Sequence, residues 1–152
     1  MNLRKKGVFS LNKLLFVNCC LRGKDSRTLR LARRLLEEYR FTHPNVVISE
    51  LALDQLHLSP TDSHMLRQRD MALGQWQMPL FTLARQFLET DLVVLAAPFW
   101  NGSFPALLHT YLEHICVPGL TFDCVDELYT GLCRAKACVL VTTRGGTYEN
   151  GS

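Results

Sequence analysis

The sequence contains no C-x-x-C pair, although it has six cysteines in 152 residues. Two of them, Cys19 and Cys20, are adjacent, and this spacing is typical of neither a zinc site nor a redox dithiol. An even count permits disulfides, but a chain of this length buries roughly two thirds of its unfolded surface without cross-links. The sequence therefore favours buried free thiols in a reducing compartment, and we expect a cytoplasmic protein without a metal site.

Long apolar runs are also absent. None approaches the roughly 18 residues that a membrane span needs, so we expect no membrane partner. The basic residues 4–6 precede an apolar stretch and superficially resemble the start of a signal peptide. However, the stretch is short, Asn18 interrupts it, and no small-x-small cleavage site follows. We interpret residues 1–12 as a basic leader and residues 13–152 as one domain.

Charge is scarce and nearly balanced, with 17 Lys and Arg against 14 Asp and Glu, a net charge of +3. The excess of basic residues lies in segments 4–6 and 22–34, which is too local to indicate a nucleic-acid surface. His109 and His114 are five residues apart on a predicted helix, so they point about 140° apart and cannot share a metal ion. We therefore expect neither a nucleic acid nor a metal as a partner.

Four short apolar runs alternate with amphipathic segments along the chain. The runs predict strands over 13–19, 45–53, 91–98 and 135–142, and helices fill the segments between them. Continuous apolar strands of this length are typical of a sheet buried on both faces. The pattern predicts an α/β fold with a parallel sheet, in which ligands bind beyond the carboxyl ends of the strands.

The loop after the first predicted strand is suited to an anion. It enters a predicted helix with the hydroxyls of Ser26 and Thr28, and Arg22, Lys24 and Arg27 lie close by in the sequence. Free backbone N–H groups and the helix dipole at such a helix start favour a phosphate. A capped surface turn with solvated basic residues is the alternative.

The same loop raises a second interpretation. Low-molecular-weight tyrosine phosphatases carry a nucleophilic cysteine after the first strand of a similar sheet, in the pattern C-x5-R-[ST]. Here Cys20 precedes Arg27 and Thr28 by one residue too many, and no Asp-Pro acid loop is present. The spacing therefore disfavours a phosphatase.

Two further loops carry residues suited to a planar ligand. Phe99 and Trp100 follow the third strand, and exposed aromatics usually have a ligand or partner to cover them, although they could also fold back onto the helices. The next residues, Asn101 and Gly102, could hydrogen-bond a planar ring. After the fourth strand, paired glycines permit a close backbone approach or form a simple turn.

Together the three loops resemble the FMN-dependent NADH-azoreductase and quinone reductase family, a flavodoxin-like group. The matching pieces are Val17-Asn-Cys-Cys20 with Asp25-Ser-Arg-Thr28, Ala97-Pro-Phe-Trp-Asn101 with Pro118-Gly-Leu-Thr-Phe122, and Thr143-Arg-Gly-Gly146. The resemblance implies a flavodoxin-like three-layer sandwich that binds FMN at the carboxyl edge of a parallel sheet.

The resemblance also implies which residues contact the cofactor. The phosphate-binding positions match Ser26, Arg27 and Thr28, with Cys19 where the family commonly has a serine. The segment along the isoalloxazine ring matches Phe99, Trp100, Asn101 and Gly102. The loop near the pyrimidine end matches Thr143, Arg144, Gly145 and Gly146, with Tyr148 at a position that can face the substrate.

The activity implied by the resemblance is a ping-pong reaction. NADH or NADPH delivers a hydride to the flavin, which then passes two electrons to a quinone or azo compound, with Tyr148 as proton donor or substrate stack. Family members are typically homodimers with flavin sites at the subunit interface. The chain looks short of a fifth strand and a last helix, so a truncated protein without activity, acting as an interaction module, is the alternative. A small electron carrier ranks third, because such carriers are acidic.

Overall fold

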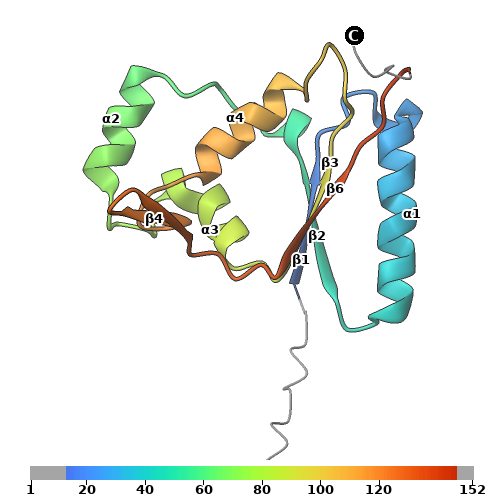
Figure 1. The fold of residues 1–152 in the computed structure, drawn as a ribbon, viewed down its shortest axis with the longest axis horizontal. Coiled ribbons are helices and arrows are strands. Elements are labelled where there is room, and N and C mark those ends of the chain that lie inside the picture. The colour runs from blue at the N-terminus through green and yellow to red at the C-terminus, as the bar shows by residue number, and fades with distance from the viewer. Residues whose placement is uncertain (1–12, 147–152) are drawn as a thin grey trace, which may run out of the picture.

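The computed structural model describes residues 13–146, and its centre is a parallel sheet (Figure 1). The strands are β1 (Lys13–Asn18), β2 (Val47–Ala52), β3 (Leu92–Ala96) and β6 (Ala137–Val141). They form a 4-stranded sheet in the order β2-β1-β3-β6, and all neighbours are parallel. The four predicted strands are therefore confirmed, with ends that differ by at most two residues. The basic leader expected over 1–12 lies outside the described residues.

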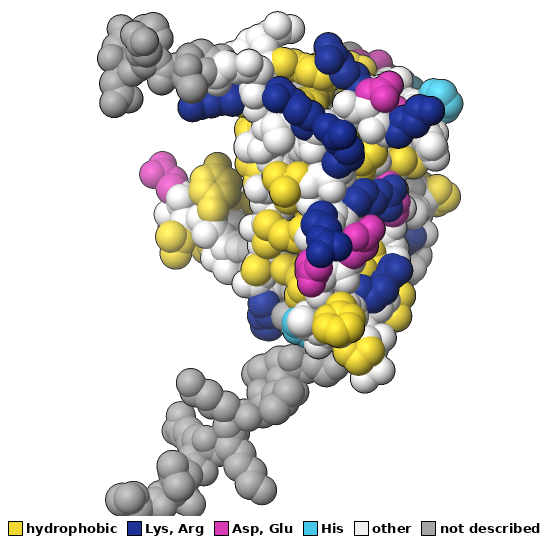
Figure 2. Space-filling view, turned by 90° about the vertical axis from the view of Figure 1, so that its right-hand side faces the viewer, with side chains coloured by type: hydrophobic (Ala, Val, Ile, Leu, Met, Phe, Trp, Pro, Cys, Tyr) yellow, Lys and Arg dark blue, Asp and Glu magenta, His cyan; other side chains and the backbone are white. Residues whose placement is uncertain are grey.

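One face of the sheet is covered by α1 (Arg27–Thr42), which runs alongside the strands (Figure 1). The helix begins where the Ser26 hydroxyl accepts a hydrogen bond from the Leu29 amide at 3.2 Å. Its apolar positions Leu29, Ala32 and Leu36 pack against Phe16 of β1. The outer face of α1 carries interspersed basic and acidic side chains (Figure 2).

The opposite face of the sheet is covered by α3 (Thr82–Leu88) and α4 (Ala106–Ile115) (Figure 1). Leu108 and Tyr111 of α4 pack against Leu15 and Val17 of β1, whose side chains alternate between the two faces. Helix α2 (Ser63–Ala72) lies further out, and short 3-10 helices span Gly23–Asp25, Leu53–Gln55 and Pro79–Phe81. The expected three-layer flavodoxin-like sandwich is thus confirmed.

A hairpin that the sequence does not predict projects from the α4 side of the sheet (Figure 1). Its strands are β4 (Phe122–Val125) and β5 (Leu128–Gly131), which pair antiparallel. The turn residues Asp126 and Glu127 both have positive φ, 49° and 64°. Asp suits the first position of such a turn, but the second position normally has Gly, so Glu127 deprives the sequence of the usual hairpin signal.

Candidate functional site

Three loops meet at the carboxyl edge of the sheet because the strands before them are in parallel register. The Cys19 amide donates to the Ala96 carbonyl at 2.9 Å, and the Ala97 amide donates to the Val141 carbonyl at 3.0 Å. Beyond the strands, the Phe99 amide donates to the Thr143 carbonyl at 2.9 Å. The sheet hydrogen bonding therefore continues into the loops and fixes their spacing.

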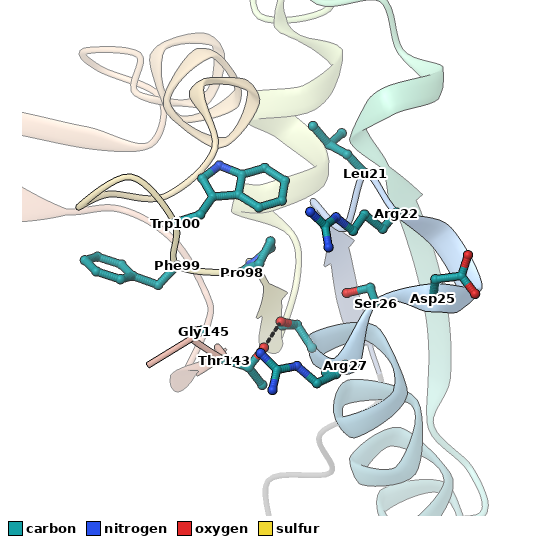
Figure 3. A pocket seen from close by; sticks show the side chains of 11 residues that line it. Leu21, Arg22, Asp25, Ser26, Arg27, Pro98, Phe99, Trp100, Thr143 and Gly145 are labelled. Carbon is teal, nitrogen blue, oxygen red and sulfur yellow. Dashed lines mark hydrogen bonds between the residues drawn. The ribbon is translucent and has the colours of Figure 1, made fainter. Parts of the chain in front are cut away.

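A cavity of about 200 Å³ lies between these loops (Figure 3). All three loops contribute to its lining, as the topology predicts. The lining residues are Leu21, Arg22, Asp25, Ser26, Arg27, Thr28, Pro98, Phe99, Trp100, Thr143 and Gly145.

The start of α1 forms the polar side of the cavity. The amides of Ser26, Leu29 and Arg30 are hydrogen-bonded to protein oxygens. Among the described residues no acceptor pairs with the amides of Arg27 and Thr28, the first two residues of the helix. Unpaired amides at a helix start, beside the Ser26 hydroxyl and an arginine side chain, form an environment suited to an anion.

Two contacts fasten the third loop to α1. The hydroxyls of Thr28 and Thr143 lie 2.7 Å apart, and the Arg27 guanidinium donates to the Arg144 carbonyl at 3.2 Å. Thr28 is only 1% exposed, so its hydroxyl depends on Thr143 for a partner. The polar end of the cavity is thus formed jointly by segments more than 110 residues apart in the sequence.

The loop after β3 forms the aromatic side of the cavity, and its two rings differ. Phe99 points away from the other side chains in Figure 3 and packs edge-on against Phe104, with ring centroids 5.6 Å apart. Trp100 is half-buried and borders the cavity. The sequence left open that both aromatic rings fold back onto the protein. Phe99 does so, whereas Trp100 remains available to a ligand.

A tight turn shapes the tip of this loop. Trp100 and Ser103 exchange two backbone hydrogen bonds, at 2.9 and 3.0 Å, around Asn101 and Gly102. Both turn residues have positive φ, 50° and 75°, which Asn and Gly tolerate best. The backbone of this pair therefore sets the position of Trp100.

Apart from Cys19, the residues predicted for the site divide into three groups. Those that line the cavity are Ser26, Arg27, Thr28, Phe99, Trp100, Thr143 and Gly145. Four others, Asn101, Gly102, Arg144 and Gly146, lie in the same loops but outside the lining. Tyr148, expected to face the substrate, lies outside the described residues.

The structure places Cys19 in the core instead of on the cavity wall. The residue is 1% exposed and packs with Leu108 and Tyr111 on the α4 side of the sheet. Burial is the main cause that raises the pKa of its thiol from 9.0 to about 12. An uncharged thiol in the core is a poor phosphate ligand, so the expected role of Cys19 at the phosphate has no support here.

The phosphatase interpretation also loses its nucleophile. Cys20 is buried at 6% exposure, and its thiol donates to the Ala96 carbonyl at 3.5 Å. Burial raises the pKa of this thiol, which disfavours the thiolate that a cysteine phosphatase requires.

The six cysteines are free thiols, but only two are buried. The expectation that all are core residues is wrong for Cys116, Cys124 and Cys138, which are exposed, and Cys133 is intermediate. Within residues 13–146, no three His, Cys, Asp or Glu side chains gather in a way that could hold a metal ion.

Sequence reasoning missed Leu21, Asp25 and Pro98 as lining residues. Each of them is adjacent in the sequence to a residue that the sequence analysis had associated with the ligand. Their position in the same loops was therefore the signal that could have identified them. The carboxylate of Asp25 points away from the other lining side chains (Figure 3), consistent with a lining that favours anions.

Comparisons with known proteins agree with this geometry. A family model described as "Flavodoxin-like fold" matches residues 12–152. An FMN-dependent NADH:quinone oxidoreductase 2 from Clostridium acetobutylicum is 36% identical over 143 residues, covering 93% of this chain and 72% of that protein. An FMN-dependent NADH:quinone oxidoreductase from Coprothermobacter proteolyticus is 33% identical, covering 90% of this chain and 69% of the relative.

A solved structure agrees in fold as well as in sequence. The crystal structure of an azoreductase from Bacillus anthracis str. Sterne has a TM-score of 0.81 and 31% identity, covering 92% of this chain and 72% of that one. No helix among residues 13–146 is both long and apolar enough to cross a bilayer. The shared sheet, the cavity at its carboxyl edge and the sequence identity together assign the chain to the flavodoxin-like family that includes the FMN-dependent NADH:quinone oxidoreductases and azoreductases.

Proposed function

We propose that this chain is an FMN-dependent NAD(P)H oxidoreductase that reduces quinones and azo compounds. The observation that carries the proposal is the cavity at the carboxyl edge of the sheet, which has an anion-binding side and an aromatic side. The names of the relatives, which are quinone oxidoreductases and an azoreductase, support the same chemistry. No observation favours the alternative of an inactive interaction module.

The residues at the start of α1 fit the phosphate of FMN. The unpaired amides of Arg27 and Thr28 supply two donors, and the Ser26 hydroxyl can donate while its oxygen accepts from Leu29. The guanidinium groups of Arg22 and Arg27 add positive charge to the same wall. A phosphate there completes the hydrogen bonding that the helix start lacks.

The other two loops fit the flavin ring. Trp100 offers an aromatic face to the ring, and the turn at Asn101 and Gly102 holds Trp100 in place. Opposite it, Thr143 and Gly145 line the cavity, and we assign the loop from Thr143 through Arg144 to Gly146 to the pyrimidine end of the ring. Gly145 has open space where a side chain would begin, so the backbone can approach a planar ligand closely.

When bound, FMN supplies the redox chemistry, accepting a hydride from NADH or NADPH and passing two electrons to the substrate. The protein binds and orients it through the groups named above. Thr28 and Thr143 hold the two sides of the site at a fixed separation. Tyr148 follows directly on this loop in the sequence, and we assign it to proton donation or substrate stacking.

The assembly we propose is a homodimer in the cytoplasm. The hairpin β4–β5 exposes large apolar side chains, with Val125 62%, Leu128 70% and Tyr129 74% exposed. Such a projecting apolar surface is suited to a second copy of the chain. Six free thiols are consistent with a reducing compartment.

Steady-state oxidation of NADH or NADPH, with a quinone or an azo dye as acceptor, tests the activity. We expect turnover that requires added FMN and gives parallel lines in double-reciprocal plots, as a ping-pong reaction does. Protein that binds FMN but shows no turnover with either acceptor class would favour the inactive alternative. Size-exclusion chromatography with light scattering tests the dimer separately.

A further inference from the structure

A polar cluster lies at the end of strand β1, outside the cavity. Asn18 is the last residue of β1, Glu50 lies on the neighbouring strand β2, and Arg33 lies on α1. None of the three is among the described residues that line the cavity. The Asn18 side-chain amide donates to Oε1 of Glu50 at 3.0 Å, so side chains as well as backbone pairing join the two strands there.

Arg33 holds the Glu50 carboxylate in place. Its Nη2 atom lies 2.7 Å from Oε1 and 2.7 Å from Oε2 of Glu50. The guanidinium carbon of Arg33 lies 5.3 Å from the centroid of the Phe16 ring, and Phe16 is 0% exposed. Because the guanidinium has both an ion-pair partner and a buried ring to rest on, it orients the carboxylate toward Asn18.

The oxygen of the Asn18 side chain reaches the loop after β1. It accepts a hydrogen bond from the Cys20 amide at 3.0 Å. If the side-chain amide turned over, its NH₂ group would face the Cys20 N–H and its oxygen would face the Glu50 carboxylate. Two donors or two acceptors cannot pair, so only the observed orientation satisfies both neighbours. Glu50 therefore selects the orientation in which Asn18 accepts from Cys20.

Cys20 begins a series of turns that ends at the cavity. Its carbonyl accepts from the Gly23 amide at 3.0 Å, and the Gly23 carbonyl accepts from the Ser26 amide at 2.9 Å. Arg22 lies within these turns, and both Arg22 and Ser26 line the cavity (Figure 3). The positions of these two lining residues thus depend on how the loop leaves the sheet at Cys20.

We propose that Asn18 and Glu50 are positioning residues for the loop that binds the FMN phosphate. Glu50 orients Asn18, and Asn18 fixes the Cys20 amide, so that Arg22 and Ser26 are held facing the phosphate. The inference rests on the proposed function and deepens it, because it assigns affinity for the phosphate end of the ligand to residues that do not touch the ligand. The ring end, which the other two loops line, should not depend on them.

Riboflavin separates the two ends of the ligand, because it keeps the flavin ring and lacks the phosphate. Glu50→Leu removes the acceptor of the Asn18 amide. In fluorescence titrations of the full chain, the dissociation constant of FMN should rise severalfold in this variant, and that of riboflavin should match the wild type. A merely structural role would weaken both ligands by the same factor, and that result would overturn the proposal.

Two further variants isolate the hydrogen bond. Glu50→Gln keeps an oxygen that can accept from Asn18, so this variant should retain most of the FMN affinity that Glu50→Leu loses. Glu38→Leu is the matched control, since it removes an ion pair with Arg34, 2.6 Å long, on the outer face of α1. Its FMN affinity should equal that of the wild type. An equal loss in Glu50→Gln and Glu50→Leu, or a comparable loss in Glu38→Leu, would contradict the assigned role.

A double-mutant cycle tests whether Glu50 acts through Asn18. Asn18→Ala should raise the dissociation constant of FMN and leave that of riboflavin unchanged, and it provides this test even if Glu50→Leu fails to fold. Adding Glu50→Leu to Asn18→Ala should cause little further loss, because the residue that Glu50 orients is already gone. Additive losses of FMN affinity would show that the two residues act independently and would overturn the proposal.

The wild-type chain separates a failure of this inference from a failure of the proposed function. Wild-type protein that binds neither FMN nor riboflavin would refute both. Wild-type protein that binds FMN, together with Glu50→Leu and Asn18→Ala variants that bind it equally well, would refute the positioning role alone.

Discussion

The hydroxyls of Thr28 and Thr143 lie 2.7 Å apart and connect the start of α1 to the loop after β6. This hydrogen bond joins the segment assigned to the FMN phosphate to the segment assigned to the ring. Since Thr28 is 1% exposed, solvent water has little access to its hydroxyl as a replacement partner. Together with the contact between the Arg27 guanidinium and the Arg144 carbonyl, this buried pair of side chains holds the proposed site together.

Replacing Thr143 by valine tests this connection. The change keeps the shape of the side chain but leaves the Thr28 hydroxyl unpaired, which we expect to lower the free energy of unfolding by about 1–3 kcal/mol. The dissociation constant of FMN should rise about tenfold, equivalent to ~1.4 kcal/mol. Urea unfolding and FMN titration measure the two effects.

Thr90 offers a matched control for that variant. It is 5% exposed, and its hydroxyl donates to the Gln86 carbonyl at 2.7 Å, away from the cavity. Thr90→Val should reduce stability without weakening FMN binding. Equal losses of FMN affinity in both variants would show that Thr143 acts only through general stability.

The charge at the start of α1 gives a second prediction. Arg27→Gln removes a cation that lines the cavity and loses the contact with the Arg144 carbonyl. We expect FMN affinity to fall about tenfold and its dependence on salt concentration to become shallower, because the interaction is partly electrostatic. Fluorescence titrations at several ionic strengths measure both. Arg30→Gln, an exposed position on the same helix outside the cavity lining, should match the wild type.

The turn that positions Trp100 gives a third prediction. Gly102 has a φ of +75°, and a β-carbon there would meet no atom within 4 Å. Gly102→Ala should therefore destabilise the fold through backbone strain alone, by about 1–2 kcal/mol. Gly131→Ala is the control, because Gly131 also has open space but no positive φ. In thermal unfolding, the midpoint temperature of Gly102→Ala should lie below that of the wild type, whereas that of Gly131→Ala should not. Equal midpoints for the two variants would argue against strain at Gly102.

Burial of Cys19 gives a prediction on pH dependence. Burial raises the pKa of its thiol to about 12 in the folded chain, whereas in the unfolded chain it ionises near 9.0. The folded state thus holds a proton that the unfolded state releases, so the contribution to stability is complete below about pH 9 and declines as the pH rises toward 12.

Unfolding in urea at about pH 8 and about pH 11 measures this decline. In Cys19→Ala, the loss of stability between the two pH values should be smaller than in the wild type. Cys124→Ala, which alters an exposed thiol, should show the wild-type loss. If Cys19→Ala loses as much stability between the two pH values as the wild type, the Cys19 thiol of the wild-type protein is not shielded from solvent.

The sequence was sufficient to predict the sheet, because its strands are continuous apolar runs whose burial on both faces leaves little ambiguity. It was also sufficient to predict the meeting of three loops, since parallel strands end at one edge. The direction of a side chain was harder to predict. Cys19 follows β1 immediately, and only the pleat of the strand decides that it faces α4 instead of the cavity.

The hairpin β4–β5 was not predictable for a related reason. Its strands have four residues each and are largely exposed, so they show neither a long apolar run nor a clear alternation. Its turn has Glu127 at positive φ, where Gly is the usual residue after Asp126.

The central claim is that this chain holds FMN in the cavity between Ser26, Trp100 and Thr143 in a redox-active state. The most direct test is the visible absorbance spectrum of the protein with added FMN, recorded before and after NADH under anaerobic conditions. We predict that about one FMN per chain remains bound after desalting and that NADH bleaches its absorbance. Protein that emerges colourless from desalting, or whose bound flavin neither NADH nor NADPH bleaches, would contradict the account.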